Sequence, residues 1–199
     1  MSLRAASIAL CLCLAACAGP GLRPPPGAWA EQRPQLEQFE RFRLQAKVAL
    51  RWPEGAETAR LSWEQRGEDT DLTLAGPFGA GAVAIERRGA RLEVRDGDSR
   101  RTLPADDPDA LAAATGWPVP VEALAWWLRG LPDPAGPRAR LRYDEGLPQR
   151  LEQGGWTVSY GRFGRVDGLL LPLALTLRYP AGALELRLAA AQWQAGAGE

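Results

Sequence analysis

The sequence predicts a mainly β protein: an incomplete, half-open antiparallel β-barrel of about eleven strands with an inserted α-helical lid and an apolar cavity. Apolar and polar residues alternate along most of the chain, which is typical of strands that bury one face. Short turns containing glycine or proline separate these segments, as in an antiparallel meander. A sheet of that many strands must curl, and a helical interruption at residues 106–130 is placed to cover its concave face.

The N-terminus has the pattern of a lipoprotein export signal. Arg4 precedes an apolar run at residues 5–14, which has the length of a secretory h-region. The run ends in Leu14-Ala15-Ala16-Cys17, a lipobox. Residues 1–16 are therefore expected to be a signal peptide and Cys17 the site of lipid attachment. An ordinary secretory signal is the alternative, but the cysteine stands where the cleavage site belongs.

The remaining chain divides into a tether and one domain. Residues 17–28 combine the lipidated cysteine with a Pro/Gly-rich stretch, which is typical of a flexible linker. Residues 29–199 are expected to form a single lidded β-barrel domain. With 24 basic and 24 acidic residues, the chain has no electrostatic footprint for nucleic acid.

The first half of the domain reads as a short helix followed by strands. Apolar residues at three- and four-residue steps predict a helix over residues 29–42, with Pro34 near its first turn. From Leu44 the period changes to two. The expected strands are 44–52, 58–66, 70–75, 82–88, 90–96 and, more weakly, 100–103.

Two helices and five further strands follow. Residues 106–116 begin with an Asp cap and end at Gly116, and residues 120–130 begin at Pro120 and end at Gly130. These two helices are the expected lid. Strands resume at 139–144, 148–153, 156–163, 171–179 and 183–193.

Large apolar side chains fall on both the expected concave face and the expected lid. The candidate cavity residues are Trp63, Leu72, Leu74, Val83, Ile85 and Trp156 on the strands, with Trp117 and Trp127 on the lid. A buried tryptophan is usually core, so the pattern alone leaves core packing and a ligand cavity equally open.

The residue types offer little for catalysis. The chain has no histidine, and its three cysteines all lie in the signal and lipobox, so His-assisted nucleophiles and the usual zinc ligands are missing. Asp106, Asp107 and Asp109 are the carboxylate cluster that a hydrolase would need. Their place in the first turn of a helix favours capping. We expect no enzyme, no metal and no cofactor beyond the covalent lipid on Cys17.

Several motifs in order resemble the family of outer-membrane lipoprotein receptors called LolB. They are the lipobox at Cys17, Trp63-Glu64-Gln65-Arg66-Gly67, Gly76-Pro77-Phe78-Gly79, Gly116-Trp117-Pro118-Val119-Pro120-Val121, Leu124 with Trp127-Leu128-Arg129-Gly130-Leu131-Pro132, Gln153 to Tyr160, Leu171-Pro172 and Trp193. The resemblance spans nearly the whole mature chain. It implies a half-open β-barrel with a helical lid and an apolar cavity.

The resemblance also implies a function. The family receives lipoproteins from the periplasmic carrier LolA and releases them into the outer membrane. LolA, the acyl chains of lipoprotein cargo and outer-membrane lipid are then the expected partners of a lipid-anchored monomer that faces the periplasm. Family members carry an exposed apolar residue, usually leucine, on a delivery loop. Pro77, Phe78 and Gly79 occupy that loop, with Phe78 in place of the leucine.

Two other functions stay open. The chain is alternatively a structural or envelope-assembly lipoprotein of the outer membrane, with an interior that is only core. A carboxylate-dependent cell-wall hydrolase is the less favoured hypothesis. Uptake of a fluorescent acyl probe by the chain would favour a lipoprotein receptor with a ligand cavity. A packed interior would exclude the probe.

Overall fold

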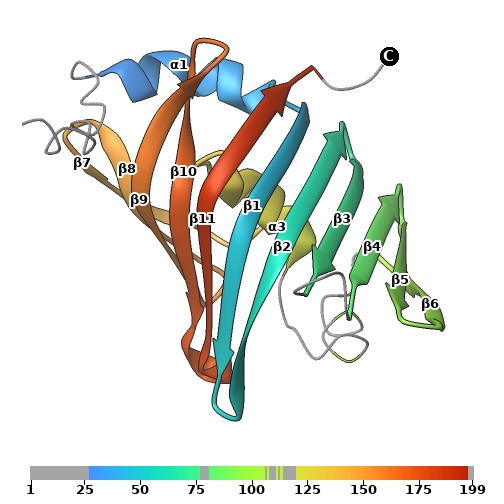
Figure 1. The fold of residues 1–199 in the computed structure, drawn as a ribbon. Helices are drawn as coiled ribbons and strands as arrows, with labels where there is room; N and C mark the ends of the chain where they lie inside the picture. Colours follow the sequence, from blue (N-terminus) through green and yellow to red (C-terminus); the bar gives the residue numbers. More distant parts are fainter. Residues whose placement is uncertain are drawn as a thin grey trace, which may run out of the picture.

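Eleven antiparallel strands form one curved sheet that does not close on itself (Figure 1). The computed structural model describes residues 27–76, 81–105, 107, 111, 113 and 120–196. The strands are β1 (Arg41–Trp52), β2 (Gly55–Arg66), β3 (Asp69–Ala75), β4 (Val83–Arg88), β5 (Arg91–Asp96), β6 (Ser99–Pro104), β7 (Arg140–Asp144), β8 (Leu147–Gln153), β9 (Trp156–Val166), β10 (Leu169–Tyr179) and β11 (Leu184–Ala195). The predicted fold class is confirmed.

Strand β1 joins the two halves of the sheet. It pairs with β2 on one side and with β11 on the other, so the spatial order runs β6-β5-β4-β3-β2-β1-β11-β10-β9-β8-β7. Leu44, for example, lies opposite Trp63 on β2 and opposite Trp193 on β11. Among the described residues no ladder connects β6 with β7, and these two strands form the open edges.

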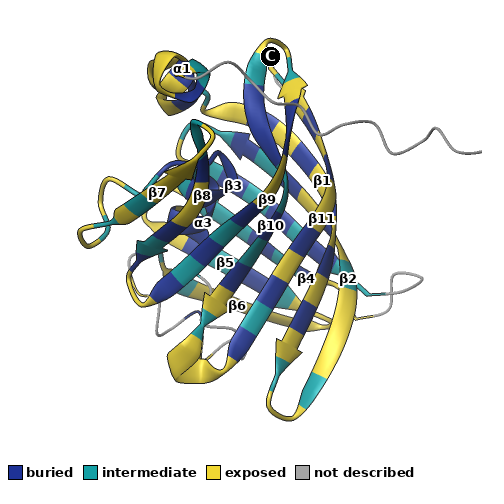
Figure 2. Ribbon diagram, turned by 90° about the vertical axis from the view of Figure 1, so that its left-hand side faces the viewer, coloured by how far each residue is buried: buried dark blue, intermediate teal, exposed yellow. Residues whose placement is uncertain are grey.

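The alternation of residue types becomes an alternation of burial. Phe42, Leu44 and Val48 on β1 are buried, whereas Arg43 and Lys47 between them are exposed. The buried positions form bands along the strands, as Figure 2 shows. Because successive strand residues point to opposite faces, one side of the sheet becomes the core and the other meets water.

In the part of the chain that the structure describes, two complete α-helices and one 3-10 turn accompany the sheet. They are α1 (Ala28–Glu37), α3 (Val121–Leu128) and η2 (Pro180–Gly182). Helix α3 lies inside the curve of the sheet, and α1 lies along its upper rim (Figure 1). None of the helices in the described part of the chain is long and apolar enough to span a bilayer.

The predicted first helix is wrong beyond Glu37. The chain leaves the helix there and enters β1 at Arg41. Phe39 and Phe42 stack on each other at 5.6 Å, and Phe42 meets Trp193 on β11 at 5.1 Å. The three-residue spacing of Phe39 and Phe42 therefore reflects aromatic packing at the start of β1 and not a helix.

The second predicted lid helix is present as α3, two residues shorter at its C-terminal end and one at its N-terminal end. Most of the first, at 106–116, lies outside the described residues. Within it, Leu111 is helical and buried.

Candidate functional site: an apolar hollow under helix α3

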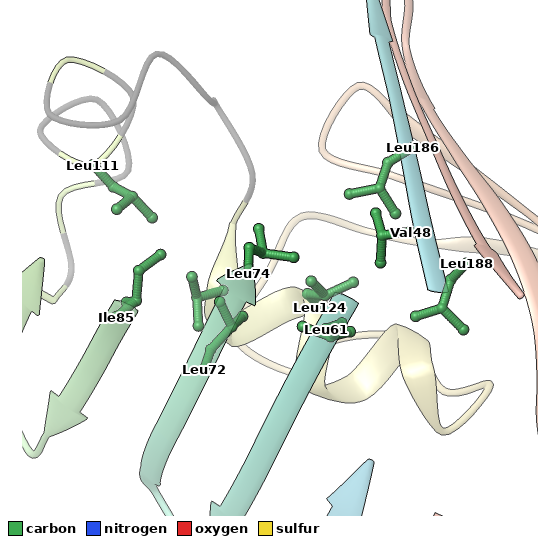
Figure 3. A pocket seen from close by; sticks show the side chains of 10 residues that line it. Val48, Leu61, Leu72, Leu74, Ile85, Leu111, Leu124, Leu186 and Leu188 are labelled. Atoms are coloured by element: carbon green, nitrogen blue, oxygen red, sulfur yellow. The ribbon is translucent and has the colours of Figure 1, made fainter. Parts of the chain in front are cut away.

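A hollow of about 40 Å³ lies between the concave face of the sheet and α3. Its lining comes from five strands, from α3 and from Leu111, and all of its side chains are aliphatic. The lining residues are Val48, Leu61, Leu72, Leu74, Ile85, Leu111, Val121, Leu124, Leu186 and Leu188. We call this space the apolar hollow. Figure 3 shows side chains from both the sheet and α3 approaching it.

Strand register explains why these side chains meet. Leu72 lies opposite Ile85 on β4, and Leu74 lies opposite Leu61 on β2. On the far side of β1, Leu188 lies opposite Val48. Directly opposed residues on one sheet face have closely spaced Cβ atoms, so the side chains of each pair contact each other and form a continuous apolar surface.

Helix α3 closes the hollow with one face. Val121 and Leu124 are three residues apart and therefore lie on the same side of the helix. Both are buried, at 6% and 5% exposure. An apolar void of this kind stays dry, because water would find no polar partner in it. It suits an apolar ligand.

The hollow is small in this state. A water molecule needs roughly 10–15 Å³ of such space, so 40 Å³ corresponds to about three water-sized spheres. A long acyl chain does not fit in that volume. In this structure α3 packs against the sheet and leaves no room for such a chain.

The C-terminal end of α3 is fastened by a buried arginine. Arg129 is 4% exposed, and its Nη1 donates to the carbonyls of Leu36 at 3.1 Å and Phe39 at 3.0 Å. Its guanidinium also lies over the Trp126 ring, 4.2 Å from the centroid. Burial lowers the pKa of Arg129 to about 10, so the side chain is still charged at neutral pH. The arginine joins the end of α1 to the end of α3.

A second set of hydrogen bonds fastens the same end to the sheet. Trp127 Nε1 donates to Gln153 Oε1 at 2.9 Å, and Tyr160 Oη donates to the Trp127 carbonyl at 3.0 Å. Gln153 also accepts from Asp133 N and donates to the carbonyls of Asp133 and Pro137. Burial raises the pKa of Tyr160, so its hydroxyl remains a donor.

Gly130 completes this fastening. Its φ is +83°, and a Cβ placed on it would lie 2.5 Å from Cη2 of Trp29 in α1. Only glycine accepts both the left-handed conformation and the close approach of an indole ring. The turn after α3 is therefore tightly packed against α1.

The N-terminal end of α3 is held differently. Besides the apolar contacts of Val121 and Leu124, Glu122 forms an ion pair with Arg87 on β4 at 2.9 Å. The Glu122 side chain is 44% exposed, so water screens this pair. One end of α3 is anchored by buried polar bonds, and the other by apolar contacts and one screened ion pair.

Three of the predicted cavity residues, Leu72, Leu74 and Ile85, line the apolar hollow. Val83 is buried next to them without being among the lining residues.

The three predicted tryptophans that the structure describes are packed in the core. Trp63 donates from Nε1 to Gln65 Oε1 at 2.8 Å, and Trp156 stacks on Tyr179 at 5.1 Å. Trp127 is 1% exposed and hydrogen-bonded to Gln153. None of the three is among the side chains that line the hollow.

Sequence reasoning missed the lining residues that depend on long-range pairing. Leu186 and Leu188 belong to β11, whose place beside β1 the local pattern does not reveal. Their alternation with Glu185 and Arg187 was the available signal. Cys17, Pro77, Phe78, Gly79 and Trp117 lie outside the described residues.

Comparison with known proteins gives a consistent result. A family model described as outer membrane lipoprotein LolB matches residues 40–193. An outer-membrane lipoprotein LolB of Chromohalobacter salexigens is 39% identical over 170 residues, covering 84% of this chain and 77% of the relative. One from Stutzerimonas stutzeri is 35% identical over 193 residues, covering 93% of this chain and 92% of the relative.

A solved structure supports the fold. A LolA-superfamily protein from Nitrosomonas europaea superposes with a TM-score of 0.55 at 9% identity, covering 86% of this chain and 95% of the other. At that identity the likeness concerns the architecture alone. Together with the family match and the two relatives, these findings show that the chain belongs to the LolB family of outer-membrane lipoproteins, non-enzymatic receptors that take part in lipoprotein localisation.

Proposed function

We propose that the protein receives the acyl chains of lipoproteins from the periplasmic carrier LolA in the apolar hollow and passes them to the outer membrane. The observation that carries this proposal is the lining itself. All ten side chains are aliphatic, and they come from both the sheet and α3. A ligand that enters between them gains apolar burial without having to satisfy a polar group.

Entry of an acyl chain requires α3 to move. The hollow of about 40 Å³ is too small for a long chain. The fastening at Arg129 and Trp127 favours a hinge at the C-terminal end of α3. The N-terminal end, held by Val121, Leu124 and the Arg87–Glu122 pair, is then the end that swings away from the sheet.

Binding of a fluorescent fatty-acyl probe tests this function. The Cys17→Ala chain without residues 1–16, which escapes lipidation, should bind the probe. Leu74→Gln places an amide in the hollow and should weaken binding at least tenfold. Its neighbour Thr73 faces the other side of β3, so Thr73→Gln is the matched control and should bind normally. Exclusion of the probe by the unsubstituted hollow would instead favour the purely structural role.

We further propose that the delivery loop at Pro77, Phe78 and Gly79 acts at the membrane. The loop connects the end of β3 at Ala75 to the start of β4 at Val83. Moving one Phe out of water contributes only about 1.5–3 kcal/mol, so Phe78 can enter and leave the lipid reversibly. Stable anchoring comes from the acyl chains on Cys17 at about 0.8 kcal/mol per buried CH₂.

The Phe78→Glu variant tests the delivery loop. It should accept a lipoprotein from the carrier and then retain it, because a carboxylate opposes entry into lipid while the hollow is unchanged. Phe78→Leu is the control and should transfer normally. Loss of uptake with normal release of any bound cargo would assign Phe78 to the hollow instead.

A further inference from the structure

The turn between β10 and β11 differs in chemistry from most other hairpin turns of the sheet. Pro180, Ala181, Gly182 and Ala183 are consecutive, exposed and uncharged. Five other described turns each carry an acidic residue, namely Glu54, Glu68, Asp98, Glu145 and Asp167. We call residues 179–184 the apolar tip.

The apolar tip has a fixed conformation. Tyr179 stacks on Trp156 at 5.1 Å, and a Cβ on Gly182 would lie 3.1 Å from the Tyr179 ring. Ala183 N donates to the Pro180 carbonyl at 3.1 Å, and Ala183 itself has a φ of +47°. Glycine is the usual residue in that conformation. The chain instead presents an exposed methyl group there.

Basic side chains lie on the outer face of the sheet, next to the apolar tip. Arg178 and Arg187 share one carboxylate, with their Nε atoms 2.7 Å and 2.6 Å from Glu185 oxygens. Arg51 on β1 lies opposite Glu185 in the register. With Glu54 on the neighbouring β1–β2 turn, three arginines lie near two glutamates, and we call these three arginines the arginine collar.

The apolar tip lies at the same end of the sheet as the C-terminal end of β3. Arg51 pairs with both Glu185 and Ala56, and Arg60, four residues further along β2, pairs with Ala75 at the end of β3. Helix α1 marks the opposite rim, where Gln32 bonds to the backbone of Leu170 near the start of β10. Figure 1 shows the β10–β11 turn at the lower end and α1 at the upper end.

We propose that the apolar tip is a membrane-contacting element that touches the headgroup layer of the outer membrane, with its arginine collar facing lipid phosphates. Four exposed residues are far too few for a stable protein interface, which needs roughly 800 Å² per partner. Small apolar groups beneath cationic side chains match the boundary between acyl chains and phosphates. The contact goes beyond the proposed function, because it requires neither cargo nor the apolar hollow.

The lipid anchor permits this contact. The ten residue-to-residue steps from Cys17 to Gly27 reach at most about 33–36 Å. Strand β11 has 12 residues and spans about 40 Å. Gly27, at the start of α1, and the apolar tip lie at opposite rims. The tether can reach Gly27 while the apolar tip touches the membrane when the strands incline by roughly 30° from the membrane normal. The domain then leans over the surface that anchors it.

A single fluorescent label tests the contact in the full lipidated protein without cargo. All three native cysteines lie at or before Cys17, so Ala181→Cys introduces the only free thiol of the mature chain. An environment-sensitive dye on it should brighten at least twofold in phosphatidylglycerol-containing vesicles. Lipids brominated near the headgroup should quench it. Ala189→Cys, exposed in the middle of β11, and Asp167→Cys, at the opposite rim, are the controls and should do neither.

A label at position 181 that behaves like the label at position 189 would overturn the proposal, and so would stronger quenching at position 167. The collar is tested separately with Arg51→Gln. This variant should reduce the brightening in phosphatidylglycerol vesicles by about half and leave it unchanged in pure phosphatidylcholine. If Arg51→Gln and its parent brightened equally in both lipids, the arginine collar would have no part in the membrane contact.

Discussion

Replacing Glu122 by glutamine should make the apolar hollow easier to open. Glu122 is on the first turn of α3, and its ion pair with Arg87 on β4 is the described charge contact between that end of the helix and the sheet. Glutamine keeps the shape and helix propensity of the side chain while removing its charge. The hinge end at Arg129 is untouched.

The size of the effect follows from the exposure of the pair. At 2.9 Å, with side chains 18% and 44% exposed, the pair is worth about 0.5–1 kcal/mol after screening. Because a ligand that needs the open form binds in proportion to the open fraction, affinity for an acyl probe should rise about two- to fivefold. Added salt should raise the affinity of the parent chain in the same way and have little effect on the variant.

Fluorescence titration of the acyl probe at low and high ionic strength measures both quantities. Arg43→Gln is the matched control, since it removes a pair of similar length, 3.1 Å to Glu64, on the exposed face of the sheet. It should leave probe affinity unchanged. Unchanged or weaker binding by Glu122→Gln, or an equal gain in Arg43→Gln, would refute the idea that α3 opens at its N-terminal end.

Three further substitutions test the fastening of α3 and the anchor. Gly130→Ala should destabilise the fold by about 2–4 kcal/mol in urea unfolding, because the new methyl group meets Trp29 and φ is +83°. Gln153→Leu should cost about 2–4 kcal/mol in the same assay, since it leaves Trp127 Nε1 and backbone groups without partners. In a chain whose residues 1–16 are exchanged for a signal that is cleaved without lipidation, Cys17→Ala should place the protein in the soluble fraction, and persistent membrane association would contradict lipid anchoring at this residue.

The fold was predictable because its signals are local. Alternation along β1 and β11 is nearly uninterrupted, and the turns between strands contain glycine, proline or acids. The helix boundary near Glu37 was not predictable in the same way. Phe39 and Phe42 fit a helical step, and only their contact with Trp193, about 150 residues away, places them in the core.

The hollow was predictable only in part because it depends on which strands become neighbours. Leu72 and Ile85 come from adjacent strands of a meander, so their proximity follows from the sequence. Leu188 reaches the same space through the β1–β11 pairing, which closes a long loop of chain. Tryptophans carry a further ambiguity, because an inward-facing indole can line a void or bond to a neighbour. Trp63 bonds to Gln65, a residue that the pattern alone does not select.

The packing of α3 against the sheet bears on the direction of the proposed transfer. Three acyl chains of about 15 methylenes would gain roughly 36 kcal/mol if all 45 were buried at about 0.8 kcal/mol each. Non-covalent affinities saturate near 18–21 kcal/mol, so a protein that covered the chains completely would not release them. Under the proposed function, each acyl chain that enters the hollow would displace Val121 and Leu124 from the sheet, and the lost contacts would offset part of the burial. A bilayer buries the same methylenes without that cost. If the hollow receives acyl chains as we propose, their transfer into the membrane is downhill and needs no driving force beyond the difference in apolar burial.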